Sequence, residues 1–208
     1  HKIKALIPVH FAGQPVDLVR IAELARQHGA YVVDDASHAL GAAYVDHGRR
    51  RSIGDNAHSD LTVFSFHPVK HVAMGEGGAV TAADPVLASR LRQLRSHGIT
   101  KREFVQSEFA FSESGELNPW YYEMTELGFN YRLTDIQAAL GASQLTRLQE
   151  SVSRRNEIAA TYKSLLSAAF GTETVRPLAT LPRLSHGYHL YVVRIDFPAF
   201  NRTRAAVI

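Results

Sequence analysis

The sequence predicts an α/β fold, in which a three-layer arrangement places helices on both faces of a sheet of short strands. Short apolar runs, bounded by glycine, aspartate or proline, occur at residues 5–9, 31–33, 61–66 and 78–81. Other segments repeat apolar residues every three or four positions, as one face of a helix does. With 208 residues, 45% of them apolar, the chain is long enough to bury a core between such layers.

The first elements follow in order from their boundaries. Residues 5–9 are predicted to form a strand, and the segment from Pro15 to Gly29 a helix that ends at the glycine. The helix is predicted because four apolar residues share one face: Leu18, Ile21, Ala22 and Ala25. Residues 31–33, 61–66 and 78–81 then supply the next strands.

The second half of the chain contains two further predicted helices. Asp84 and Pro85 indicate a helix start, since aspartate caps a helix and proline fits its first position; the apolar stripe Leu87, Leu91 and Leu94 follows. Residues 100–120 show no period and are expected to form a flexible loop. Thr134 and Gln137 form a capping box for a long helix, with a stutter expected near residues 141–145. Residues 171–187 read as loop and 188–195 as a strand.

Composition narrows the chemistry. The chain has no cysteine, which excludes disulfides, thiolate metal sites and cysteine nucleophiles. A net charge of +3, with scattered basic residues, does not favour a nucleic-acid partner. No apolar run approaches the roughly 18 residues of a membrane span, so we expect a soluble, cytoplasmic protein without a membrane partner. Because the chain starts inside an apparent strand without methionine and stops abruptly, we expect it to be part of a longer protein.

Adjacent acids follow one predicted strand. Asp34 and Asp35 come directly after residues 31–33, which places them at a carboxyl strand end, where parallel sheets bind ligands. Two neighbouring acids are costly to bury without a cationic partner. A purely structural interpretation, with one aspartate capping the next turn and the other solvated, is equally consistent with the sequence. His38 follows three residues after Asp35 and could share the same site.

A hydroxyl, an imidazole and an amine follow another strand. Ser65, His67 and Lys70 lie within six residues, and Pro68 makes the path extended or turned. A lysine held among apolar neighbours has a lowered pKa and can attack a carbonyl. The alternative is a surface lysine. His67 and His71 are four residues apart, but Pro68 prevents a regular helix between them, so we expect no metal site.

The glycine-rich run of residues 75–78 lies five residues beyond Lys70. Glycine lets the backbone approach a neighbour closely or adopt positive φ. The run matches neither a Walker A nor a dinucleotide-binding pattern. Its interest is therefore its position beside the lysine.

Taken together, these motifs resemble the DegT family of pyridoxal-phosphate-dependent nucleotide-sugar aminotransferases. Five segments carry the resemblance in order along most of the chain: Val33-Asp34-Asp35-Ala36-Ser37-His38-Ala39, Phe64-Ser65-Phe66-His67-Pro68-Val69-Lys70, Gly75-Glu76-Gly77-Gly78-Ala79-Val80, Arg95-Ser96-His97-Gly98-Ile99, and the run from Gly128 to Gly141 that includes Asn130-Tyr131-Arg132. Within the family, the His-Pro-Val-Lys and Ser-His-Gly versions most resemble members of the pseudaminic acid pathway.

The resemblance implies roles for five residues. Lys70 would form the Schiff base with pyridoxal 5'-phosphate and move the proton during transfer. Asp35 would pair with the pyridine nitrogen, and the physics agrees, because a carboxylate keeps that nitrogen protonated. His38 would lie beside the ring, Ser65 would bind the phosphate, and Asn130 would reach the phosphate of the other subunit. Asp34 departs mildly from the family, which usually has glutamate there.

The same resemblance implies an architecture and a reaction. Residues 1–150 would be most of a large cofactor domain of the aspartate aminotransferase type, and residues 151–208 a linking helix and the start of a small α+β domain. A homodimer would use glutamate and a 4-keto-6-deoxy nucleotide sugar, with the active site at the subunit interface. Two alternatives stay open, a non-catalytic sensor that keeps the cofactor fold and an inactive fragment. Lys70 argues against the sugar-dehydrating branch, where histidine replaces the lysine.

Overall fold

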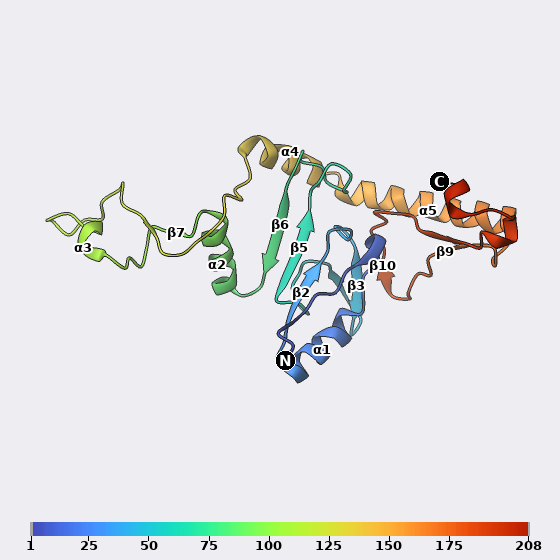
Figure 1. Ribbon diagram of the computed structural model, residues 1–208, viewed down its shortest axis with the longest axis horizontal. Coiled ribbons are helices and arrows are strands. Elements are labelled where there is room, and N and C mark those ends of the chain that lie inside the picture. Colours follow the sequence, from blue (N-terminus) through green and yellow to red (C-terminus); the bar gives the residue numbers. More distant parts are fainter. Residues whose placement is uncertain (1, 208) are drawn as a thin grey trace. The chain divides into compact units, whose positions relative to one another are not determined.

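A computed structural model describes residues 2–207, shown in Figure 1. The terminal residues 1 and 208, on which the expectation about the chain ends partly rests, lie outside the described residues. The chain divides into two compact units, one formed by residues up to Thr81 together with those from Ile136 onward, the other by Ala82–Asp135. Each unit is described by itself. The division at residue 150 stays a prediction.

The first unit contains a four-stranded sheet of order β1-β2-β5-β6. Its strands are β1 (Ala5–Leu6), β2 (Tyr31–Asp35), β5 (Leu61–Ser65) and β6 (Gly78–Ala82). β2 pairs in parallel with both neighbours, with Ala5 opposite Tyr31 and Val33 opposite Leu61. Figure 1 shows the arrow of β6 running opposite to that of β5. The predicted α/β fold is confirmed, since this largely parallel sheet is combined in one chain with the helices described next.

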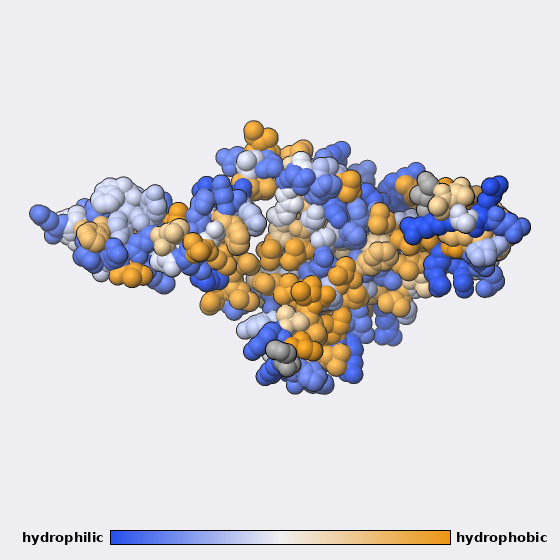
Figure 2. Space-filling model, in the orientation of Figure 1, coloured by the Kyte–Doolittle hydropathy of each residue, from blue (hydrophilic) through white to orange (hydrophobic). Residues whose placement is uncertain are grey.

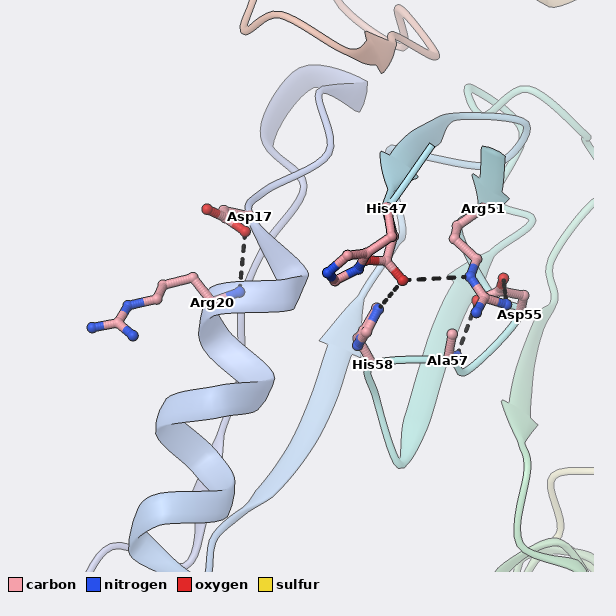
Figure 3. A network of polar contacts seen from close by, with 8 residues as sticks. Asp17, Arg20, His47, Arg51, Asp55, Ala57 and His58 are labelled. Atoms are coloured by element: carbon pink, nitrogen blue, oxygen red, sulfur yellow. Dashed lines mark hydrogen bonds and ion pairs between the residues drawn. The ribbon is translucent and has the colours of Figure 1, made fainter. Parts of the chain in front are cut away.

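Helix α1 (Leu18–His28) forms because its ends are capped and one face is apolar. Asp17 accepts a hydrogen bond from the Arg20 backbone N–H at 3.1 Å, drawn in Figure 3, and Gly29 ends the helix with φ +60°. Leu18, Ala22 and Ala25 are buried, as the helical spacing predicts. The short 3-10 turn η1 (Phe11–Gly13) precedes it.

A hairpin that the sequence analysis did not predict joins β3 (Ala43–Asp46) to β4 (Arg49–Ser52). Its turn residues His47 and Gly48 both have positive φ, as a tight two-residue hairpin turn requires. Figure 3 shows side chains gathered near this turn, where Asp46 contacts His47 at 2.6 Å and His58 at 3.1 Å. β10 (Leu184–Ser185) adds a third strand beside β3.

The core of the first unit lies between α1, the hairpin and the sheet. Its members are buried apolar side chains from these elements and from the loop after β5: Leu18, Ala36, Ala39, Ala42, Tyr44, Ile53, Phe64, Phe66, Val72 and Met74. Burial on this scale is the main favourable term in folding. The core therefore fixes the ends of β2 and β5, where the candidate site residues lie.

The long C-terminal helix is interrupted. α4 (Asp135–Leu145) and α5 (Leu148–Phe170) are separated by Thr146 and Arg147, one residue beyond the stutter expected at 141–145. α4 packs closely on Met74 at Gly141, where an added Cβ would lie 2.5 Å from Met74 Cε. Within residues 2–207, no helix is both long and apolar enough to cross a membrane.

Less regular structure follows α5. β9 (Val175–Pro177) pairs antiparallel with β11 (Val193–Ile195), so the strand predicted over 188–195 is real only at its end. Residues 188–192 instead carry a turn at Tyr188, whose φ is +48°. Two 3-10 turns, η2 (Pro198–Phe200) and η3 (Arg204–Ala206), complete this part.

The second unit is built on α2 (Pro85–Arg95), which begins at the Asp84 cap as predicted. Its predicted stripe of leucines is only half-buried. Short strands β7 (Ile99–Thr100) and β8 (Glu123–Met124) pair antiparallel, and between them α3 (Ser107–Ala110) is a single helical turn. The segment expected as a loop is therefore mostly irregular, and the two strands pair at its base.

An apolar surface lies along the β1 edge of the sheet. Figure 2 shows hydrophobic residues gathered over the part of the first unit near β2. The exposed apolar side chains of this edge are Ile3, Ile7, Val9, Phe11 and Tyr31. Each of these side chains is about half exposed or more. An exposed apolar strand edge is a common place for protein contacts.

Candidate active site

Asp35 is the last residue of β2 and is half-buried. Its Oδ1 accepts a hydrogen bond from the Ser37 backbone N–H at 3.0 Å, so it caps the turn that follows the strand. Burial alone would raise the pKa of Asp35. Hydrogen bonds from Ser37, helped by the positive charge of Lys70, outweigh burial and hold that pKa below its usual range. Asp35 is therefore an ionised carboxylate at neutral pH.

Lys70 lies in a closed loop after β5. Its backbone N–H donates to the His67 carbonyl at 2.9 Å, which makes a turn through Pro68. The Phe66 N–H donates to the Gly77 carbonyl at 2.8 Å, and the Met74 N–H to the Phe66 carbonyl at 3.1 Å. These bonds close residues 66–77 into one loop that begins where β5 ends. The loop thus presents Lys70 at the carboxyl edge of the sheet, as the sequence predicts.

Because β2 and β5 pair in parallel, Asp35 and the loop that carries Lys70 follow strands that end at the same edge of the sheet, and the Lys70 charge acts on both Asp35 and His38. Burial, and after it the Lys70 charge, lower the pKa of His38 despite the opposing Asp35 carboxylate. His38 Nδ1 is buried and, within residues 2–207, has no hydrogen-bond partner. A buried imidazole nitrogen without a partner is unusual and marks a place where a ligand atom can bind.

Ser65 ends β5, the strand paired with β2. Its hydroxyl oxygen accepts a long hydrogen bond of 3.4 Å from the His67 backbone N–H. Since Asp35 lies opposite Val63 in the parallel register, Ser65 and Asp35 belong to the same edge of the sheet. The hydroxyl is half-buried and keeps a proton to donate.

Two histidines beside this site, His186 and His189, were missed by the sequence analysis, and His71 was considered there only as a metal ligand. The His189 ring lies 4.5 Å from the His38 ring and 5.7 Å from the His71 ring, between centroids. His71 Nε2 lies 2.8 Å from the Gly187 carbonyl oxygen, and His186 stacks on Tyr188 at 3.8 Å. The only local signal is the pair His186 and His189 ahead of a strand. They come close to His71 through the contact between His71 and Gly187, two residues that are 116 positions apart in the sequence.

These histidines are neutral in the folded chain. Burial, helped by nearby positive groups, lowers the pKa of His189 to about 4, and burial does the same for His186. The unfolded chain binds a proton at the ordinary histidine pKa of 6.5. Between these two values the unfolded state holds more protons, so stability is full above about pH 6.5 and falls as the pH drops toward 4.

We expect His186→Asn to weaken this acid sensitivity. In the unaltered chain, His186 Nδ1 accepts a hydrogen bond of 2.8 Å from the Tyr188 backbone N–H. The asparagine side-chain oxygen can accept the same hydrogen bond, but asparagine does not titrate. The loss of stability between about pH 6.5 and 4 should shrink by on the order of 1–3 kcal/mol. Chemical denaturation at several pH values measures this. His28→Asn, on an exposed helix end, is the control, and an unchanged slope in His186→Asn would contradict the assignment.

The other motif residues have structural positions. Gly75 has φ +81°, and a Cβ on Gly78 would lie 2.8 Å from the Phe64 carbonyl, so the glycine run permits close backbone packing. His67 is exposed, with Nε2 3.7 Å from a Glu76 carboxylate oxygen, whereas His71 is buried. Among the described residues, no three histidine or acidic side chains gather in a way that could hold a metal.

Asn130 belongs to the second unit. It is exposed and forms an isolated antiparallel bridge with Ser96, next to the hydrogen bond from the His97 N–H to the Phe129 carbonyl at 2.9 Å. Its predicted contact with the phosphate of another subunit stays a prediction. Asp34, by contrast with the solvated position considered above, is buried, with Oδ1 2.7 Å from His10 Nε2.

A sequence profile of the DegT/DnrJ/EryC1/StrS aminotransferase family matches residues 1–208. The chain belongs to this family. The predicted resemblance is thereby confirmed at the level of the family. Aminotransferases of the DegT/DnrJ/EryC1/StrS family depend on pyridoxal phosphate.

Individual relatives match most or all of the chain. It is 37% identical over 207 residues to the spore coat polysaccharide biosynthesis protein SpsC of Bacillus subtilis, spanning 100% of this chain and 49% of SpsC. The crystal structure of Helicobacter pylori PseC, an aminotransferase involved in pseudoaminic acid biosynthesis, matches with 30% identity and a TM-score of 0.76 over 95% of this chain and 47% of PseC. DesV of S. venezuelae matches with 35% identity and a TM-score of 0.72 over 93% of this chain and 45% of DesV. The chain thus spans about half the length of the relatives it matches.

The site residues of the chain fit the family cofactor. Pyridoxal phosphate carries an aldehyde, a pyridine nitrogen and a phosphate, which call for an amine, a carboxylate and hydrogen-bond donors. Lys70, Asp35 and Ser65 are of these types and lie at one sheet edge, and the buried, unpartnered Nδ1 of His38 leaves a polar atom for the ring. These four residues would hold the cofactor.

Proposed function

We propose that the whole protein is a pyridoxal-phosphate-dependent aminotransferase that moves an amino group from glutamate to a 4-keto-6-deoxy nucleotide sugar. The product would be a 4-amino sugar for a bacterial surface glycan or for flagellin glycosylation. The observation that supports this proposal is that an ionised Asp35 and the loop that carries Lys70 both follow the paired parallel strands β2 and β5, where the Lys70 charge also lowers the pKa of His38. Family membership and the name of SpsC support the sugar class.

A finer product is proposed from the motifs. The runs His67-Pro68-Val69-Lys70 and Ser96-His97-Gly98 most resemble the transaminase that makes UDP-4-amino-4,6-dideoxy-N-acetyl-β-L-altrosamine. The likeness to PseC supports the same class. Since pocket contacts decide which sugar is accepted, the substrate panel below is the direct test.

The residues of the chain would divide the work. When bound, pyridoxal phosphate supplies an electron sink that stabilises a carbanion. Asp35 would hold a proton on the ring nitrogen, because its own pKa is low and its carboxylate is the nearby anion. The Lys70 amine would bind the cofactor covalently and then carry the proton between the amino-bearing carbon and the cofactor. His38 would donate or accept a hydrogen bond at the ring, and the Ser65 hydroxyl would donate to the phosphate.

The assembly and location are part of the proposal. We propose a homodimer in which Asn130 of one subunit contacts the phosphate bound by the other, so that the active site lies at the subunit interface. We propose a large cofactor domain over residues 1–150 and the beginning of a small domain over 151–208. The enzyme would work in the cytoplasm, where nucleotide sugars are made.

The decisive experiment is a substrate panel. Full-length protein is incubated with glutamate and, in parallel, UDP-, GDP- and dTDP-linked 4-keto-6-deoxy sugars, and amino-sugar products are identified by mass. We expect product from a UDP-linked sugar at the fastest rate. A protein that binds the cofactor without reacting with glutamate or any sugar would indicate a non-catalytic sensor. Absence of cofactor binding by the full-length protein would refute the proposed function.

A further inference from the structure

His10 is a fully buried imidazole between β1 and η1, with an exposed fraction of 0%. The Val16 backbone N–H donates a hydrogen bond to His10 Nδ1 at 3.0 Å. A ring nitrogen that accepts a hydrogen bond carries no proton, so the ring proton of His10 lies on Nε2. The chain fold therefore selects one tautomer of His10 and makes Nε2 a donor.

That donor faces a buried acid. His10 Nε2 lies 2.7 Å from Oδ1 of Asp34, which is 1% exposed. Within the described residues neither atom has a hydrogen-bond partner of standard geometry, so their 2.7 Å approach is a close polar contact between two buried groups. The Thr62 hydroxyl lies 3.5 Å from the other Asp34 oxygen, a distance too long for a strong hydrogen bond. His10 is thus the principal partner of a carboxylate that is costly to bury alone.

The backbone of His10 binds the next residue. Its N–H donates to the Asp35 carbonyl at 3.2 Å, and the Asp35 N–H donates to the Pro8 carbonyl at 2.9 Å. One residue therefore holds Asp34 through its side chain and Asp35 through its main chain. Because successive side chains of a strand point to opposite faces, holding Asp34 on the buried side directs Asp35 to the other side, where the charges of His38 and Lys70 act on it.

We propose that His10 is a positioning residue that fixes the direction of the Asp35 carboxylate and thereby the affinity for the pyridine ring of the cofactor. The inference rests on the proposed function, because it assigns Asp35 to the ring nitrogen. It adds a residue that the family motifs identified in the sequence do not contain. His10 itself touches neither Lys70 nor the cofactor in this scheme and acts through the Asp34–Asp35 peptide.

Two substitutions separate the two nitrogens. His10→Gln keeps an amide donor at about the distance of Nε2 and can still serve Asp34. His10→Asn keeps only an acceptor at about the position of Nδ1 and leaves Asp34 without a donor. We expect His10→Asn to bind pyridoxal phosphate at least about tenfold more weakly than the unaltered protein, and His10→Gln to restore most of that affinity.

The measurements are a pyridoxal phosphate titration followed by absorbance and ¹⁵N NMR of the histidine rings, both on full-length protein. NMR of the cofactor-free protein should show the His10 ring proton on Nε2 and an unprotonated Nδ1. Val152→Ala, which removes buried methyl groups from α5, is the control for a general loss of stability. It should leave cofactor affinity and the pH dependence of the absorbance band unchanged, whereas His10→Asn should change both.

The outcomes distinguish this inference from the proposed function. Equal cofactor affinity in His10→Asn and the unaltered protein overturns the role of His10 alone. Detection of a proton on His10 Nδ1 also overturns it, because the Val16 N–H would then not fix the ring proton on Nε2, the nitrogen that faces Asp34. If the unaltered full-length protein binds no pyridoxal phosphate, the proposed function and this inference fall together.

Discussion

Lys70→Ala is expected to reduce transamination by the full-length protein by about 10⁴-fold or more, the largest effect of any single substitution in the site. The amine would be lost both as the group that binds the cofactor and as the group that moves a proton, and each role alone accounts for large factors in rate. The turn that holds Lys70 uses its backbone N–H, so alanine preserves the loop. The fold should therefore survive while the chemistry is lost.

The measurement combines kinetics with absorbance. Lys70→Ala should lack the absorbance of the lysine-bound cofactor while keeping the thermal midpoint of the unaltered protein. Lys4→Ala removes an exposed amine from the start of the chain and should change neither property. Lys70→Arg keeps the positive charge beside Asp35 and His38 without a group that attacks an aldehyde, so it should be as inactive as alanine. Substantial turnover by Lys70→Arg would contradict the role given to the amine.

The places of Asp35 and Lys70 in the fold were predictable from local patterns, while their roles stay a prediction from the family resemblance. Asp35 and the loop that carries Lys70 follow apolar runs, and parallel pairing of β2 with β5 brings the carboxyl ends of these strands to one edge. Helix α1 was predictable for the same local reason, since Asp17, the apolar stripe and Gly29 all lie within it. The spacing of residues along the chain was therefore enough to predict the bounds of this helix and the ends of these strands.

Other features depend on contacts that no local pattern records. His71 meets the Gly187 carbonyl, and His38 meets His189, across more than a hundred residues of chain. The β3–β4 hairpin was missed because its turn uses His47 where glycine or asparagine is more usual at positive φ, and because β4 consists of Arg49, Arg50, Arg51 and Ser52, which are not typical strand residues. The buried pairing of His10 with Asp34 belongs to the same class, because the sequence alone left Asp34 as a solvated or capping residue.

Gly128→Ala is expected to disrupt the second unit, at a cost of about 3 kcal/mol or more in stability. An added Cβ would lie 2.1 Å from the Gly98 nitrogen and 2.7 Å from the Leu94 carbonyl oxygen. Both are backbone atoms at the end of α2, so no side-chain rotation can relieve the clash. The nearby hydrogen bond from the Phe129 N–H to the Leu94 carbonyl, 2.7 Å long, would have to lengthen or break.

Hydrogen exchange and limited proteolysis should locate this damage. We expect the amides of His97 and Phe129 to lose protection in Gly128→Ala, while amides of α1 keep theirs, because the two units have separate contacts. Gly115→Ala is the matched control in the same unit: it has φ +79° and nothing within 4 Å of an added Cβ, so it should cost only the backbone strain of about 1–2 kcal/mol. Equal protection losses in the two variants would show that close packing at Gly128 is not what holds the segment before Asn130. If close packing at Gly128 does hold this segment, Gly128→Ala should also weaken any dimer in which Asn130 contacts the phosphate of the neighbouring subunit. The control Gly115→Ala, at an uncrowded position, should leave such a dimer unchanged.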